Sequence, residues 1–184
     1  MKKIILCTVV LILSGTKVSA QENVVKTNIL SPLFYSGSVS FEHVFNWSSS
    51  YNIGISYTPS QEISASYFDE KQKLTGFAAT LGLRLYTKKD APSGYYLGPY
   101  LRHQSVSLET DDISATLSVS SAGIITGYQF IINEVFSIDI YSGGGIGMYN
   151  IDESSSFDEV TDLLGGGKFV GSAVTFGFML GYAF

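Results

Sequence analysis

The sequence has one cysteine, few basic residues and no long apolar run beyond its first twenty residues. Cys7 lies inside the apolar run over residues 4–13, so a chain cleaved after Ala20 contains no cysteine and no disulfide framework. Lys and Arg number 11 against 16 Asp and Glu, without a basic cluster, which argues against nucleic acid as a partner. The absence of a second apolar run argues against a transmembrane helix, which needs about 20 such residues.

Residues 1–20 have the pattern of a secretory signal peptide. Lys2 and Lys3 precede the apolar run, and small residues end the segment at Ala20. Cleavage there removes three of the 11 basic residues, which leaves 8 against 16 acidic residues and a net charge of −8. The pattern predicts an exported chain with one domain over residues 21–184.

After residue 20, large apolar side chains recur at every second position almost throughout, and helical spacing is hard to find. This period predicts eight strands whose second face is small or polar. Short connections alternate with longer ones rich in Ser, Asp and Glu, at residues 58–73, 109–116 and 150–168. Such alternation is typical of bacterial membrane barrels. The predicted strands cover residues 24–30, 36–45, 51–57, 74–86, 95–107, 117–131, 135–149 and 170–184.

Two architectures fit these strands. A soluble β-sandwich or lipocalin-like barrel would place the apolar faces inside and expose a surface rich in glycine, which weakens strands. A membrane barrel places the apolar faces outside and uses glycine to make room inside a narrow lumen. Aromatic residues also gather at both strand ends, as expected of interfacial girdles. The favoured prediction is an eight-stranded antiparallel transmembrane β-barrel, an up-and-down meander, in the outer membrane of a Gram-negative bacterium.

Three segments in the first third of the chain carry a family resemblance. They read KTNILSP at residues 26–32, SFEHVFN at 40–46 and IGISY at 53–57. The chain resembles the DUF3575 family of small outer-membrane barrels from Bacteroidetes. The resemblance implies an eight-stranded barrel and an outer-membrane location, and it implies no established activity.

Five charged residues fall on the small or polar faces of the predicted strands. Inside a narrow barrel they would be buried, and buried charges need partners. We interpret them as a structural polar network of the barrel interior, because eight strands leave no continuous aqueous channel for a proton or solute path. The five residues are Lys26, Glu42, Arg84, Arg102 and Asp139.

His103 and Ser105 form the best catalytic candidate. They are two residues apart, on one outward face, and a histidine can activate a serine for acyl transfer when a carboxylate orients it. The pair is similar to that of outer-membrane lipid A deacylases, although no acidic residue stands at that family's downstream spacing and Glu109 is only nearby. An interfacial histidine beside a loop-edge serine is the preferred interpretation.

The acidic pairs of the long connections have no calcium-loop spacing, so no metal site and no cofactor are predicted. The chain ends on alternating apolar residues that resemble the signal read by the outer-membrane assembly machinery: Phe178, Leu180, Tyr182 and Phe184. Outer-membrane lipid and lipopolysaccharide are the expected surroundings. The predicted role is structural or surface-interacting through the long loops, without an open pore. The alternatives are a lipid A acyl hydrolase and a loop-mediated ligand binder or adhesin.

Overall fold

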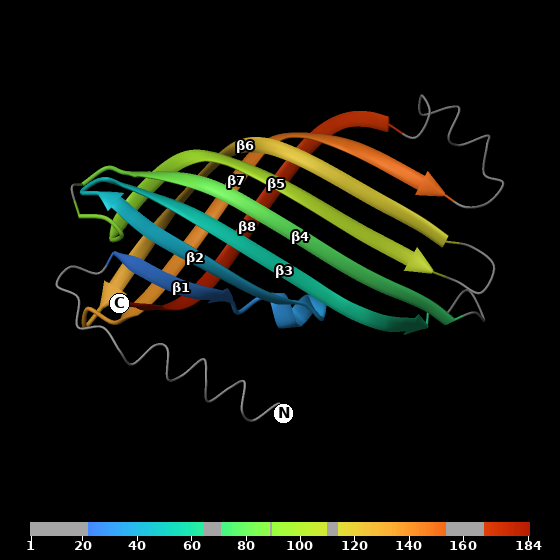
Figure 1. The fold of residues 1–184 in the computed structure, drawn as a ribbon, viewed down its shortest axis with the longest axis horizontal. Coiled ribbons are helices and arrows are strands. Elements are labelled where there is room, and N and C mark those ends of the chain that lie inside the picture. Colours follow the sequence, from blue (N-terminus) through green and yellow to red (C-terminus); the bar gives the residue numbers. More distant parts are fainter. Residues whose placement is uncertain (1–21, 65–70, 89, 110–113, 154–167) are drawn as a thin grey trace.

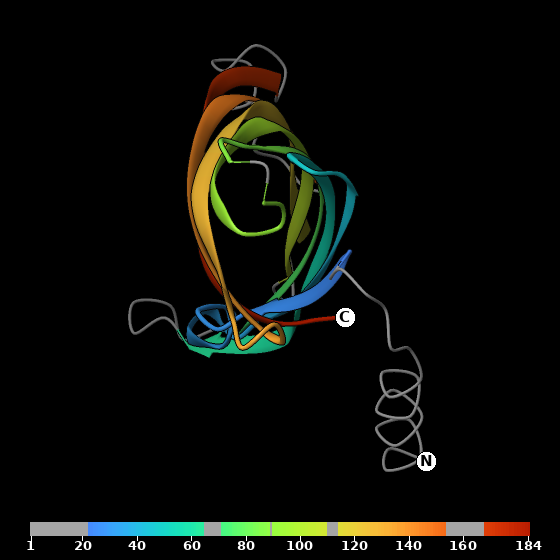
Figure 2. The ribbon, with the colours of Figure 1, turned by 90° about the vertical axis from the view of Figure 1, so that its left-hand side faces the viewer.

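The computed structural model describes residues 22–64, 71–88, 90–109, 114–153 and 168–184. In this part of the chain, eight antiparallel strands follow one another around a closed ring, which confirms the predicted meander (Figures 1 and 2). No helix among these residues is long and apolar enough to cross a membrane. The elements are β1 (Asn23–Asn28), the 3₁₀ helix η1 (Ser31–Phe34), β2 (Gly37–Asn46), β3 (Ser49–Ser64), β4 (Lys71–Tyr86), β5 (Gly94–Glu109), β6 (Ser114–Ile132), β7 (Phe136–Glu153) and β8 (Lys168–Ala183).

The two ends of the barrel differ. At one end β2 passes to β3, β4 to β5 and β6 to β7, and the start of β1 and the end of β8 lie there as well (Figure 1). We call this end the turn end. At the opposite end, which we call the loop end, β3 leads to β4, β5 to β6 and β7 to β8. Two of the connections at the turn end are tight: β2 and β3 are separated by Trp47 and Ser48 alone, and β6 and β7 by residues 133–135.

The ring closes through a short pairing of β1 with β8. Val24 pairs with Ala183, and the pairing ends at Asn28 opposite Met179. The terminal residue takes part, since the Asn23 N–H donates to the Phe184 carbonyl at 3.1 Å and the Phe184 N–H donates back at 2.9 Å. The last residue of the chain is therefore part of the seam that closes the barrel.

Several strands are longer than the sequence pattern predicts. β3 continues to Ser64 and β4 begins at Lys71, inside the predicted connection 58–73. These extensions pair polar residues, as in Glu62 with Lys73, across a register shift that contains Pro59. They show no apolar alternation, and a strand held by backbone pairing alone leaves no such signal. The predicted long connections are therefore too long, by one to seven residues at each end.

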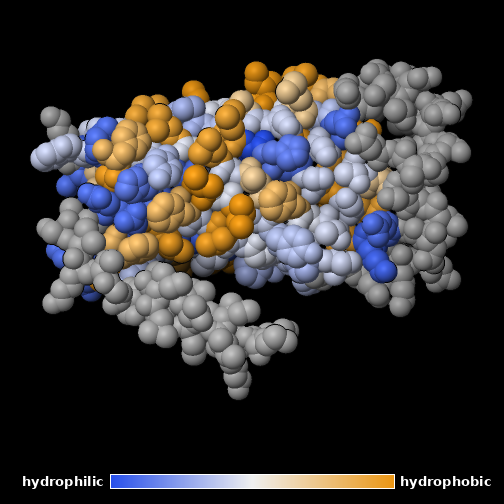
Figure 3. Space-filling model, in the orientation of Figure 1, coloured by the Kyte–Doolittle hydropathy of each residue, from blue (hydrophilic) through white to orange (hydrophobic). Residues whose placement is uncertain are grey.

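The strand faces have the predicted sense. Val174 is 80% exposed and Ile146 66% exposed on the outside, whereas Lys26 and Arg84 are each 1% exposed. Figure 3 shows hydrophobic side chains spread along the middle of the visible outer wall. Apolar groups outside and charges inside reverse the arrangement of an ordinary soluble domain.

The aromatic pattern of the sequence predicts a loop-end girdle of Tyr57, Phe68, Tyr149 and Phe169, but two of these four, Tyr149 and Phe169, lie on the inward side. Tyr149 lies over the paired glycines Gly147 and Gly171, and its hydroxyl donates to the Ser172 carbonyl at 2.8 Å. Its ring stacks on Phe169 at 4.7 Å between centroids. Residue parity places both partners on the glycine side of their strands, so this end of the girdle is thinner than predicted. Phe68, the further aromatic assigned to it, lies outside the described residues.

The wall is lowest on the side of β1 and β2. β1 ends at Asn28, and η1 carries the chain across to Gly37, the first residue of β2. β8 is paired with β1 only from Met179 onward, and β3 is paired with β2 only as far as Tyr57. Figure 1 shows β1 and η1 ending well short of the other strands at the loop end. Toward the loop end, β8 before Met179 and β3 beyond Tyr57 therefore have no strand pairing on this side among the described residues.

Candidate functional site

A cluster of four charges fills the barrel interior near the turn end. The Lys26 ammonium lies 2.5 Å from Glu42 Oε2 and 2.9 Å from Asp139 Oδ2. Arg84 Nη1 lies 3.1 Å and 2.8 Å from the same two oxygens. Each cation thus contacts both carboxylates, and each carboxylate contacts both cations. We call Lys26, Glu42, Arg84 and Asp139 the ion cluster.

Neutral side chains complete the hydrogen bonding of the ion cluster. The Gln129 carbonyl accepts from Lys26 at 3.0 Å and from Arg84 at 2.8 Å. Glu42 Oε1 accepts from the Tyr86 hydroxyl at 2.6 Å and also from Ser50. The carboxylates therefore keep several donors in place of the water that they lose on burial, which buried charges require.

Tyr96 supports both signs of charge. Its hydroxyl donates to Asp139 Oδ1 at 2.8 Å, and its ring lies 4.3 Å from the guanidinium carbon of Arg84. A cation over an aromatic face is a favourable contact when water is excluded. Neither Tyr96 nor Ser50 is among the residues that the sequence pattern predicts for this network. The alternation of the sequence indicates that both side chains point inward, but it does not indicate at which level along the barrel axis they lie.

Glycines provide the room for this packing. A Cβ atom on Gly127 would lie 2.6 Å from the Tyr96 hydroxyl, and one on Gly181 would lie 2.5 Å from Cγ of Lys26. Gly181 is on β8, and the other members of the site come from β1 to β7, so every strand contributes at this level. An eight-stranded barrel is just wide enough for side chains to fill it. The lumen is consequently blocked here by a neutral plug, with two positive and two negative charges.

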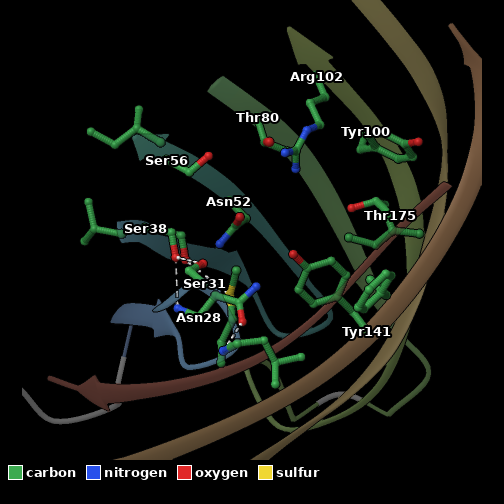
Figure 4. Close-up of a pocket in the computed structure, with 18 of the residues that line it drawn as sticks. Asn28, Ser31, Ser38, Asn52, Ser56, Thr80, Tyr100, Arg102, Tyr141 and Thr175 are labelled. Carbon is green, nitrogen blue, oxygen red and sulfur yellow. Dashed lines mark hydrogen bonds between the residues drawn. The ribbon is translucent and has the colours of Figure 1, made fainter. Parts of the chain in front are cut away.

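A cavity of about 220 Å³, lined by both polar and apolar side chains, lies on the loop-end side of the ion cluster. Its walls carry hydroxyl and amide side chains from several strands together with two tyrosines (Figure 4). At its edge the Ser38 hydroxyl accepts from the Asn28 N–H at 3.1 Å and contacts the Ser31 hydroxyl at 3.1 Å. Its labelled lining residues are Asn28, Ser31, Ser38, Asn52, Ser56, Thr80, Tyr100, Arg102, Tyr141 and Thr175.

Arg102 lies apart from the ion cluster. It lines the cavity, and its Nη2 donates to Gln104 Oε1 at 3.1 Å, farther toward the loop end. Arg102 shares the inward parity of the other four charges, which is why the sequence predicts one network of five. Parity tells which face a side chain occupies but not its height along the lumen. The interior charges thus belong to two levels, four in the plug and one in the cavity.

A family model described as "protein of unknown function (DUF3575)" matches residues 5–158, which is most of the chain and includes strands β1 to β7. The chain belongs to the DUF3575 family. Curated proteins and solved structures were also compared with it, and neither comparison found a match. This family membership agrees with the resemblance found in the first third of the sequence. The description of the family assigns no activity to the chain.

In this DUF3575 protein, His103 and Ser105 lie side by side on β5 but bond to β6. His103 Nδ1 lies 2.9 Å from the Ser120 hydroxyl, and Ser105 accepts from Ser118 at 3.4 Å. Glu109 stands six residues farther along the strand, about 20 Å away at the rise of an extended chain. A carboxylate at that distance does not orient the His103 ring, so the described contacts assemble no triad.

The remaining candidates give little chemistry. Phe178, Leu180, Tyr182 and Phe184 alternate along the end of β8, and Tyr182 stacks on Phe184 with ring centroids 6.2 Å apart. No group of His, Cys, Asp or Glu that could hold a metal ion occurs among the described residues. The acidic pairs at residues 111–112 and 158–159, and Asp162, all lie outside the described residues.

Proposed function

We propose that this DUF3575 protein is an outer-membrane β-barrel whose lumen is closed by the ion cluster and whose loop end serves a structural or surface-interacting role. One observation carries the proposal: apolar side chains cover the outside of the wall while four charges are buried within it. Soluble monomers rarely expose contiguous apolar surface of more than a few hundred Å². In a lipid bilayer, this apolar surface contacts hydrocarbon and its exposure to water is avoided.

Strand length supports the same conclusion. β5 has sixteen residues, which span about 53 Å along the strand and about 40 Å along the barrel axis at the usual tilt. The apolar band of such barrels is about 25 Å tall. The strands therefore suffice to cross a bilayer and to project beyond it, and the polar extensions of β3 and β4 suit the projecting part.

Closure of the ring supports it too. A bilayer offers no water to unpaired backbone groups, so a spanning sheet must have no open edge. The β1–β8 seam, which includes Phe184, removes the edge at the turn end. We propose that the segment Phe178 to Phe184 is read by the outer-membrane assembly machinery, that residues 1–20 direct export, and that lipid and lipopolysaccharide surround the wall.

Heat-dependent gel mobility of protein extracted from the outer-membrane fraction tests the proposal. A folded barrel remains compact in unheated detergent and migrates differently from the boiled chain. We expect the protein in the outer-membrane fraction with a clear mobility shift. Recovery in the soluble periplasmic fraction, or identical mobility before and after boiling, would refute the proposal.

A further inference from the structure

The cavity above the ion cluster has an excess of hydrogen-bond donors and positive charge. Among the described residues, its lining includes Arg84 and Arg102 but no aspartate or glutamate. Arg84 is neutralised by the carboxylates below it, whereas the contact described for Arg102 is with a neutral amide. Arg102 therefore brings to the cavity one positive charge that no carboxylate of the described residues neutralises.

Two buried donors on the cavity wall have no acceptor among the described residues. Asn52 is 7% exposed and its Nδ2 makes no hydrogen bond, and the same holds for Nε of Arg84, which is 1% exposed. Buried donors without partners are rare and costly in folded proteins. Figure 4 shows the guanidinium of Arg102, from β5, beside Thr80 of β4 and on the same side of the barrel as Asn52 of β3. All three groups donate, so the complementary ligand is rich in acceptors and negatively charged.

Size and access restrict the ligand further. A cavity of about 220 Å³ corresponds to the liquid volume of about seven water molecules, which suits a molecule the size of a monosaccharide. Leu30, Ser31 and Ser36, which line it, belong to the connection between β1 and β2, where the barrel wall is lowest. The ion cluster closes the other side, so a ligand enters from the loop end and leaves by the same route.

We propose that this cavity binds a small hydroxylated oxyanion, a sugar carboxylate or sugar phosphate, through Arg102, Asn52 and Nε of Arg84. The oxyanion group pairs with Arg102, and the serine and threonine hydroxyls of the wall contact the ligand hydroxyls. This site gives the proposed surface-interacting role a class of ligand. It depends on that proposal only in one respect, namely that the loop end faces the outside of the cell. Binding stops at the plug, so the protein captures the solute without conducting it.

Calorimetric titration of the folded, detergent-solubilised full chain tests the site, with glucuronate, glucose 6-phosphate and neutral glucose as probes. We expect binding of at least one of the two anions and none of glucose at the same concentration. The two anions separate carboxylate from phosphate preference. Absence of heat with both anions, from protein that still shows the gel mobility shift, overturns this site alone. Loss of the shift overturns the membrane-barrel proposal instead.

Three variants locate the binding. Arg102→Gln removes the charge and should weaken anion binding about ten-fold or more, the usual effect of losing a charge-assisted hydrogen bond. Lys73→Gln removes an equal charge from an exposed β4 position outside the cavity and should leave affinity unchanged. Equal weakening by both variants would show a general charge effect and refute the site.

Asn52→Leu separates a binding role from a structural one. Its Nδ2 makes no hydrogen bond within the described chain, so replacement by an apolar side chain of similar size should leave the unfolding temperature unchanged or higher. Affinity for the anion should nevertheless fall several-fold. Unchanged affinity in this folded variant would remove Asn52 from the site and contradict the donor argument.

Discussion

The ion cluster makes a quantitative prediction about Asp139→Asn. This change keeps the size of the side chain and removes one of two buried negative charges, which leaves Lys26 and Arg84 facing Glu42 alone. Asp139 contacts Lys26 at 2.9 Å, Arg84 at 2.8 Å and the Tyr96 hydroxyl at 2.8 Å. Removing one partner of a buried ion pair leaves an uncompensated charge and costs about 3–5 kcal/mol. We expect a loss of that size in the free energy of unfolding.

A double variant separates charge balance from lost packing. Lys26→Met together with Asp139→Asn removes one charge of each sign, so the interior returns to neutrality with the Arg84–Glu42 pair intact. The double variant should therefore be more stable than Asp139→Asn alone, and the two changes should deviate from additivity by about 1–3 kcal/mol, as expected for residues in one charged network.

Urea unfolding in detergent or lipid, followed by circular dichroism and by the gel mobility shift, measures these free energies. Agreement between the two probes supports the use of a single transition. The reasoning fails if Asp139→Asn stays within about 0.5 kcal/mol of the unchanged protein, the usual range for surface substitutions. It also fails if the two changes are simply additive, since the cluster would then not act as a unit.

Three further predictions concern single positions. Gly127→Ala should destabilise the barrel by about 1–3 kcal/mol in urea unfolding, because the added Cβ would lie 2.6 Å from the Tyr96 hydroxyl. Gly144→Ala is the control, because a Cβ there would have no atom nearer than 3.9 Å and should be tolerated. Equal loss of stability in the two variants would contradict the packing described around Gly127. Phe184→Ser should lower the amount of heat-modifiable protein in the outer membrane while the refolded barrel keeps its stability, because the seam uses the backbone of residue 184; normal assembly in cells would argue against the assembly signal. His103→Ala should leave the acylation pattern of lipid A unchanged by mass spectrometry, because its ring bonds to β6 and not to Ser105, and loss of a deacylated species would reverse that conclusion.

Most of the architecture could be predicted from local pattern. Alternation of large and small residues in segments such as Val174 to Tyr182 specifies strands, their number and which face is apolar, because side chains of a strand alternate between its two faces. The same rule placed Lys26, Glu42, Arg84 and Asp139 inside. It failed where strands have no apolar face, as at Glu62 and Lys73, because backbone pairing across a register shift leaves no trace in hydropathy.

What only the tertiary structure decided is the height of each side chain in the lumen. Four of the five inward charges meet at one level of the lumen, and Arg102 lies closer to the loop end. Register and strand tilt determine which residues face one another across the interior, and both depend on all eight strands together. Tyr96 entered the plug for the same reason, and Asn52 became an unpaired donor on a cavity wall. The sequence by itself therefore determined a closed sheet with apolar groups outside and charges inside, and tertiary packing divided that interior into a plug and a cavity.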